Sequence, residues 1–480
     1  MPMGWRASPF YFTKLMRVMV GYLRAPAVVR ERAVMQRLGV KRGAKKAKMR
    51  RGRGVVTSGP WRHRTVGLRV LPYVDDFLGF CETEEDALAA RDFVGETMGE
   101  LAISRKVGKG QWDQHVQRLE HLGLVVDTKQ ALFQVTPARC GKLRTLAKDI
   151  LCRASRDRRL ISRKALESFC GLGNSTSLAC PAARFYLREL YTVCASASAH
   201  WSGKVRLTAQ AWRDLEWWSD FGRSERETRR AIWRSPDTAT LHCDASKEGH
   251  KGGWGGVHND TTPARGFWRP HQLVHHITLL ELKAVRLTVQ TFLDELRGHR
   301  VRLYEDNQAV MHILNNVTTR SPAIMAELRK LWKLLDANDI DLRAEYIRSA
   351  ANVWADALSR EADDEDWKLH PQLFADLDAR WGPHTVDRFA SANNAQCRRF
   401  NSRWRDPLTE AVDAMARHWR AHPTTGELEV NWVNPPWSEL ADVVQKLRED
   451  GAAATVVAPY WSSAIWFRDL LEILVVLVRG

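Results

Sequence analysis

The chain has 480 residues, enough for about three domains at roughly 100–200 residues each. Its formal net charge of +17 and its pI of about 9.7 favour a polyanionic partner, of which nucleic acid is the commonest, although a basic surface that only resists aggregation would have the same composition. The eight cysteines form no CxxC pair, which argues against a zinc site and indicates reduced thiols.

Nothing in the sequence indicates a membrane or secreted protein. No signal peptide opens the chain, and the apolar run at residues 473–478 is far short of the ~20 residues that span a bilayer. We therefore expect an intracellular protein, in the cytoplasm, the nucleus or both, with no membrane partner.

The first third contains a predicted helix and a basic run. Apolar residues recur at helical spacing over residues 10–23. Residues 41–53 are rich in lysine, arginine and glycine. This basic run is either a linker or nuclear-import signal, or a flexible arm that neutralises phosphates, and both can hold together.

Residues 68–80 have the pattern of a β-hairpin with two acids, Asp75 and Asp76, at its tip. Adjacent carboxylates repel each other, so a hairpin holds them together only if cations neutralise them. Two divalent metals that also bind a nucleotide's phosphates would do this.

This region resembles a reverse transcriptase. Residues 2–5 and 12–15 are similar to the family's template-contacting turn and helix, and residues 73–76 (Tyr-Val-Asp-Asp) to its metal-binding hairpin. Lys106 or Lys109 falls near its triphosphate-side lysine, and residues 119–123 resemble its primer grip. The resemblance implies a partial palm subdomain over residues 1–136 that binds a DNA or RNA template-primer.

The resemblance also shows a departure. The family needs a third aspartate on an earlier strand, and fingers that hold the nucleotide, and this chain begins at the turn that follows both. We therefore expect negligible polymerase activity from the chain alone, unless another chain supplies the missing parts.

Residues 137–236 are rich in helix formers. Trp217, Trp218 and the basic cluster at 226–234 would suit a thumb or connection that packs on a duplex. A plain helical packing domain with a solvated basic face explains the same residues, and both explanations stay open.

The hydrophobic period changes at residue 239 and predicts a mixed sheet with helices on its faces, over residues 237–360. The expected strands are 239–245, 253–258, 264–269, 301–304 and 341–347, and the expected helices are 279–297, 308–315, 322–337 and 352–360.

Four acids stand at the ends of these elements or within the first strand. Each has an ordinary explanation: Asp244 accepting turn amides, Glu281 completing a capping box with Thr278, Asp306 capping a helix, and Asp356 in a helix's first turn. Together, the four acids in this order are better explained by one shared metal site.

The pattern resembles ribonuclease H. Residues 243–246 with 253–256 are similar to its first hairpin, 280–284 to its glutamate helix, 304–307 to its fourth-strand aspartate, and 352–360 to its closing motif. The resemblance implies two Mg²⁺ or Mn²⁺ ions, roughly 3.5–4 Å apart, held by the acid quartet, and hydrolysis of RNA in RNA–DNA hybrids. The histidine that often precedes the closing motif is absent at residues 346–349, which implies slower turnover.

After an acidic linker at 361–368, residues 369–480 predict a Rossmann-like α/β domain. Strands are expected near 386, 430 and 453–458, with helices at about 407–419 and 438–449.

The segment Asn434, Pro435, Pro436 and Trp437 follows an apolar strand. Asparagine and proline oxygens there can accept hydrogen bonds from an exocyclic amine while the aromatic ring stacks on a flipped base. The alternative is a strand that ends in a rigid Pro-Pro turn.

Residues 370–374, 389–391, 394–395 and 434–437 occur in the order seen in phage-type DNA adenine methyltransferases, which this segment resembles. The resemblance implies catalysis by residues 434–437 and S-adenosylmethionine binding at Asp387, Phe389, Ala390 and Ser391. Trp437 replaces the commoner tyrosine or phenylalanine, and there is no glycine-rich cofactor loop.

A palm, ribonuclease H and a methyltransferase-like domain, in this order, resemble a DIRS-type retrotransposon polyprotein. We therefore expect a multidomain α/β and α+β chain whose surviving activity is a hybrid-specific ribonuclease. The alternative is a degenerate remnant that binds nucleic acid through charge and catalyses nothing.

Overall fold

The computed structural model describes residues 19–21, 23–24, 68–73, 76–100, 103, 112, 115–196, 203–248, 252–360 and 368–475. The basic run at 41–53, the template-contacting turn, Asp75, both candidate lysines and linker residues 361–367 lie outside them. The chain divides into two compact units, Met1–Arg139 with Arg229–Ile232, and Cys140–Thr228 with Trp233–Gly480.

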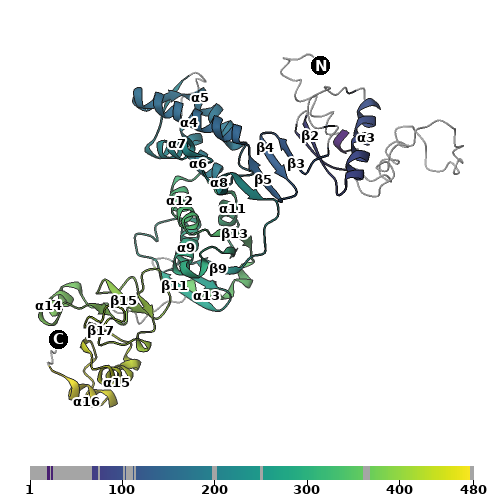
Figure 1. Ribbon diagram of the computed structural model, residues 1–480. Coiled ribbons are helices and arrows are strands. Elements are labelled where there is room, and N and C mark those ends of the chain that lie inside the picture. The colour runs from purple at the N-terminus through teal and green to yellow at the C-terminus, as the bar shows by residue number, and fades with distance from the viewer. Residues whose placement is uncertain are drawn as a thin grey trace, which may run out of the picture. The chain divides into compact units, whose positions relative to one another are not determined.

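The first unit contains the predicted hairpin (Figure 1). Strands β1 (Arg69–Tyr73) and β2 (Asp76–Phe80) pair antiparallel, with Tyr73 opposite Asp76. Helix α3 (Glu84–Glu100) buries Phe93 against this hairpin. A second sheet has the order β3-β4-β5-β8, with bounds Arg118–His121, Leu124–Asp127, Leu132–Val135 and Arg229–Ala231. The segment expected to be the primer grip is the β3–β4 hairpin.

The second unit begins with a helical region. Its helices are α4 (Pro137–Arg156), α5 (Arg163–Asn174), α6 (Ala182–Ala195), α7 (Ala209–Asp220) and α8 (Glu225–Thr228), with a hairpin of β6 (Leu160–Ser162) and β7 (Lys204–Arg206). Trp218 is fully buried, and Trp217 stacks on Tyr186 with ring centroids 4.0 Å apart. Both tryptophans thus take part in the internal packing of this helical region.

The next region is the predicted mixed sheet. Strand order is β11-β10-β9-β12-β13, with β9, β10 and β11 antiparallel and β12 parallel to both β9 and β13. The bounds of the strands are Ala239–Ala245, Gly253–His258, Thr262–Phe267, Arg300–Glu305 and Asp341–Tyr346, and those of the helices are α9 Ile277–Thr291, α10 Leu293–Leu296, α11 Gln308–Asn316, α12 Pro322–Ala337 and α13 Val353–Arg360.

Two predicted boundaries in this region were wrong. The third strand starts at Thr262, earlier than expected, because a turn at Asn259 and Asp260, both with positive φ, ends the second strand at once. The single helix expected over 279–297 breaks at Phe292, whose fully buried ring belongs to the core.

Glycines in β10 let helices pack on both faces of the sheet. A Cβ at Gly255 would lie 2.4 Å from the carbonyl oxygen of Ala355 in α13. A Cβ at Gly256 would lie 2.3 Å from Oγ1 of Thr288 in α9. Because successive strand residues point to opposite faces, α9 and α13 lie on opposite sides of β10.

The C-terminal region is a parallel sheet of order β16-β15-β14-β17-β18. The strands are Ala411–Val412, Arg399–Ser402, Val386–Asp387, Val430–Val433 and Ala453–Val456, and the helices are α14 Pro371–Trp381, α15 Leu440–Asp450 and α16 Ile465–Ile473. The predicted α/β sheet is confirmed.

The helix expected over 407–419 was wrong. That segment forms the short strand β16 and one 3₁₀ turn, Ala414–Ala416. Asp413 has a φ of 57° and its side chain accepts a hydrogen bond from the Met415 amide, so the backbone turns where a helix would have to continue.

The chain is thus a mixed α/β and α+β multidomain protein. Among the helices that the structure describes, none combines the length and the apolar character needed to cross a membrane.

Candidate functional site

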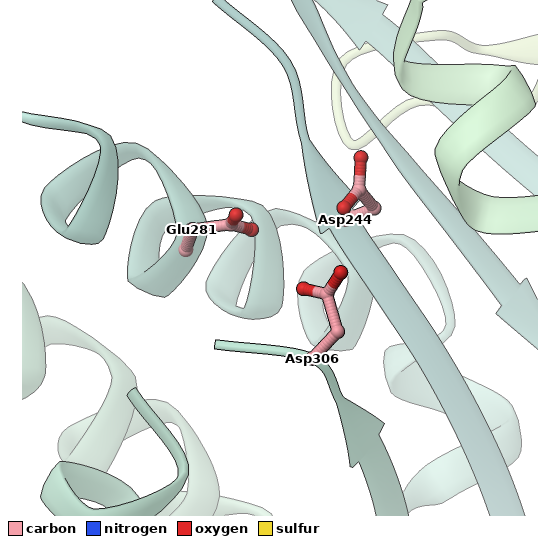
Figure 2. Close-up of side chains that lie close together, drawn as sticks. All are labelled: Asp244, Glu281 and Asp306. Atoms are coloured by element: carbon pink, nitrogen blue, oxygen red, sulfur yellow. The ribbon is translucent and has the colours of Figure 1, made fainter. Parts of the chain in front are cut away.

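Three of the four predicted acids meet at one end of the mixed sheet. Asp244 lies in β9, Glu281 in α9, and Asp306 directly after β12, and one carboxylate oxygen of each lies within 4.8 Å of the others. Figure 2 shows the three side chains converging from these elements. The parallel register pairs His242 with Tyr304, so Asp244 and Asp306, each two positions further on, lie at the same edge of the sheet.

Asp244 is almost fully buried, and its environment is mostly unfavourable to a negative charge. Burial raises the pKa of its carboxyl to about 6; a hydrogen bond from Ser359 opposes this, and the nearby Asp306 and Asp356 carboxylates add to it. Oγ of Ser359 donates to Oδ2 at 2.5 Å. The explanation from turn amides therefore does not describe this side chain: a hydroxyl from α13 holds it.

Glu281 is buried on the first turns of α9. Burial raises its pKa well above the usual range, and the neighbouring Glu305 and Asp244 add to the effect, while the backbone N–H of Ala245 opposes it. Its Oε2 has no hydrogen-bond partner within the described part of the chain. The helix is capped by His276, whose ring accepts from the Thr278 amide, so no capping box forms here.

Asp306 is also free of the capping role. The N-cap of α11 is Asn307, whose side chain accepts hydrogen bonds from the amides of Ala309 and Val310. Asp306 instead faces Asp244 (Figure 2).

Asp356 stands apart from the three-acid cluster but lines the same cavity, of about 300 Å³. It lies in the first turn of α13, and its Oδ1 accepts from Nε of Arg360 at 2.7 Å. Arg360 also donates to Glu248, at 3.2 Å. The structure thus places the fourth acid on the cavity wall, paired with a cation.

These residues fit a divalent metal ion. Hard cations such as Mg²⁺ prefer carboxylate oxygens, and a bound cation would offset the burial and mutual repulsion of the three acids. The unpartnered oxygen of Glu281 is the observation that a protein-only hydrogen-bond network leaves unexplained.

Two residues at this site were missed from the sequence. Ser359 was only part of a motif, and its role depends on α13 docking against β9. Glu305, fully buried with an unpartnered Oε2, lies directly before Asp306, and burial raises its pKa well above the usual range. Alternation along β12 would have revealed it, because Val301, Leu303 and Glu305 share the inward face.

The acids of the N-terminal hairpin are described only in part. Asp76 begins β2 opposite Tyr73, and Asp75 lies outside the described residues.

Loops that follow all five strands of the parallel sheet line a second cavity. Its lining includes Phe389, Ala390 and Ser391 after β14 and residues 434–437 after β17, with further residues after β15, β16 and β18 and others from the mixed-sheet region. In a sheet of this order, ligands usually bind in the crevice between the two central strands where the strand order reverses, here β14 and β17.

Asp387 does not line this cavity. Its buried carboxylate accepts hydrogen bonds from the amides of Phe389, at 3.4 Å, and Gln396, at 3.0 Å, and so shapes the turn. Trp437 is half exposed, and its ring meets Trp461 edge-on with centroids 5.1 Å apart. Arg388 lies within the segment 387–391 that was expected to bind the cofactor but was not itself named, whereas Asn401 reaches the cavity only because β15 pairs with β14.

Part of the chain matches a known protein family. Residues 357–475 match the family model for DNA N-6-adenine-methyltransferase (Dam). No curated protein matches the chain.

Among solved structures, ribonuclease H1 from the archaeon Halobacterium salinarum NRC-1 is 21% identical over 26% of this chain and 98% of that chain, with a TM-score of 0.23. LC11 ribonuclease H1, obtained from compost and solved with an RNA/DNA hybrid, is 18% identical. The match covers 27% of this chain and 98% of that chain, with a TM-score of 0.24. A foamy viral protease-reverse transcriptase solved with an RNA/DNA hybrid is 14% identical. The match covers 63% of this chain and 38% of that chain, with a TM-score of 0.26.

Residues 357–475 are therefore similar to the DNA adenine methyltransferase family.

Proposed function

We propose that the chain hydrolyses the RNA strand of RNA–DNA hybrids at the cavity around Asp244. The observation that carries this proposal is the meeting of three carboxylates, two of them almost fully buried, at one edge of the mixed sheet. The substrate class comes from the motifs in the first hairpin, the glutamate helix and the closing helix, which resemble ribonuclease H.

In this proposal Asp244, Glu281 and Asp306 hold the metal and Asp356 is the fourth ligand. Mg²⁺ bound by such acids supplies activation of the attacking water and charge stabilisation of the leaving oxygen. Ser359 fixes the direction of the Asp244 carboxylate through its 2.5 Å hydrogen bond. Arg360 offsets the negative charge of the Asp356 carboxylate while no metal ion is bound.

Replacing Asp244 with asparagine tests the proposal. The variant keeps the shape of the side chain but lowers its affinity for a cation. We expect Mg²⁺-dependent cleavage of a labelled hybrid to fall at least about 100-fold, since even losing a residue that only supports a metal ligand typically costs about 10–100-fold. Hybrid binding, measured by fluorescence anisotropy, should stay within about threefold because phosphate contacts dominate affinity.

The matched control is Asp294→Asn, which makes the same change at an exposed side chain of α10. It should cleave like the unchanged protein. Cleavage by Asp244→Asn at the rate of the control would contradict the assignment.

The second candidate, from a different class, is a nucleic-acid-binding protein without catalysis. Its support is the net charge of +17. Binding of the hybrid without any cleavage in Mg²⁺ or Mn²⁺ by the unchanged protein would favour it over the ribonuclease.

We further propose the domain plan of a DIRS-type retrotransposon polyprotein. It consists of a partial palm at 1–136, a thumb or connection at 137–236, ribonuclease H at 237–360, a linker at 361–368 and a methyltransferase-like domain at 369–480. The family match over residues 357–475 supports the last of these.

The methyltransferase-like domain would use S-adenosylmethionine as methyl donor in the cavity that residues 434–437 line. Asn434 would accept a hydrogen bond from the adenine amino group, and the Trp437 ring would stack on the base. Transfer of a labelled methyl group to adenine in DNA, lost in Asn434→Ala, tests this. No transfer by the unchanged protein would contradict it.

A further inference from the structure

Arg388 is a buried cation in the floor of the cavity of the parallel sheet. It directly follows β14, is 4% exposed and lines the cavity. Its Nε donates to Oδ1 of Asn431 at 2.7 Å, and its Nη1 donates to Oδ1 of Asn401 at 2.9 Å. Both partners are neutral amides.

No carboxylate within the described residues forms an ion pair with Arg388. The acids that influence it most, Glu429 and Glu410, are bonded to Arg399, which binds Glu429 at 2.8 Å and Glu410 at 2.6 Å. Burial lowers the pKa of the Arg388 guanidinium, and those distant acids only partly oppose this. A buried charge without a partner of opposite sign is costly, so this cation is suited to an anion from outside the chain.

Asn401 supplies, beside Arg388, a side-chain donor that makes no hydrogen bond within the described residues. This residue of β15 is 1% exposed and lines the same cavity, and its Nδ2 has no hydrogen-bond partner among the residues described. Asn431 differs, since its Nδ2 donates to the carbonyls of Trp419 at 2.9 Å and Ala453 at 2.8 Å. Because the amide oxygen of Asn401 already accepts from Arg388, its unused NH₂ group lies next to the guanidinium.

We propose that Arg388 and Asn401 form an oxyanion-binding site in this cavity. The ligand is a nucleoside derivative that carries either a carboxylate, as in a nucleoside joined to an amino acid through the amino acid's side chain, or a phosphate. Guanidinium and amide N–H groups donate to either anion in the same way. The proposal rests on the nucleoside-binding role proposed for this cavity, but it requires only ligand binding and neither methyl transfer nor hybrid cleavage.

Isothermal titration calorimetry of the full chain with two pairs of probes tests the site. S-adenosylhomocysteine carries a carboxylate that methylthioadenosine lacks, and deoxyadenosine monophosphate carries a phosphate that deoxyadenosine lacks. In one pair, we expect the probe with the carboxylate or phosphate to bind at least about tenfold more tightly than the counterpart that lacks it. The pair that shows the difference identifies the source of the anion, and no difference in either pair would overturn the proposal.

The variant Asn401→Asp gives a second test. It keeps the acceptor for Arg388, replaces the unused donor with a second acceptor, and supplies the guanidinium with an internal counter-ion. The preference for the anionic probe should disappear, whereas neutral probes should bind as before. Gln445→Glu, the same change of charge on the exposed face of α15, is the control and should retain the preference. Retention of the preference by Asn401→Asp would overturn the assignment. The comparison in the unchanged protein stands even if this variant does not fold.

Discussion

Asp244, Glu281 and Glu305 are buried acids whose pKa values are all raised, and burial is the first cause for each. None of the three forms an ion pair with a side chain among the described residues. In the metal-free protein these groups therefore oppose folding whenever they are charged, and a bound cation removes that cost.

The stability of the metal-free protein should reflect this. The pKa of Asp244 is about 6 in the folded chain and about 3.8 otherwise, so the folded state retains the proton longer. Stability from this group is present below about pH 4 and is lost as the pH rises through 6. In EDTA, Asp244→Asn should thus become more stable than the unchanged protein by about 2–3 kcal/mol between pH 4 and 7, as measured by urea unfolding.

Excess Mg²⁺ at pH 7 should reverse that order, because only the unchanged protein gains a bound cation. An identical pH dependence for the two proteins in EDTA would show that Asp244 is not strained by its charge.

Ser359 should influence the pH above which the site can cleave RNA, through its hydrogen bond to Asp244. Its hydroxyl favours the charged form of Asp244, so Ser359→Ala should raise the pKa of that carboxyl further. A hydrogen bond to a charged group is worth about 1.5–3 kcal/mol, so the acid limb of the cleavage–pH profile should move up by about one to two units.

Ser349→Ala, in the same cavity wall, is the control, because the Ser349 hydroxyl makes no hydrogen bond to Asp244. An unshifted profile for Ser359→Ala would exclude this role.

At the scale of elements, the hydrophobic period predicted most of the mixed sheet. Helix α12 has the bounds that were expected for it, 322–337. The failures have local causes that periodicity does not contain. A positive φ at Asp413 breaks the expected helix, and Phe292 turns inward where a helix was expected to continue. The acid cluster was predicted from the order of the acids on the strand and helix pattern, whereas Ser359 and Asn401 contact their partners only through tertiary packing.

Gly255 sets the distance between β10 and the helix that carries Asp356. Since a Cβ would lie 2.4 Å from the Ala355 carbonyl and 2.7 Å from Leu358 Cβ, Gly255→Ala should displace α13. We expect a loss of about 1–3 kcal/mol in unfolding free energy and reduced cleavage. Gly171→Ala, in α5 with no neighbouring atom within 4 Å of the new Cβ, should be neutral or stabilising. Equal stability of the two variants would refute the close-packing argument.

For the whole molecule, a net charge of +17 should make nucleic-acid binding depend strongly on salt. Each neutralised phosphate releases a counterion, so hybrid affinity should fall at least about tenfold between 50 and 200 mM salt. Fluorescence anisotropy over this range measures the slope. Affinity that does not change with salt would mean that the positive charge is not used for binding.

The hydrogen bond between Ser359 and Asp244 joins positions 115 residues apart. During synthesis the strand that carries Asp244 is made long before α13, and the closure of so long a loop has an entropic cost that only the docked helix repays. The acids of the cavity are therefore all present in a growing chain before the group that orients them. The proposed nuclease would therefore remain inactive until residues beyond 360 have left the ribosome. Its RNA-cleaving site would be complete only after the ribosome has translated the whole region that forms it.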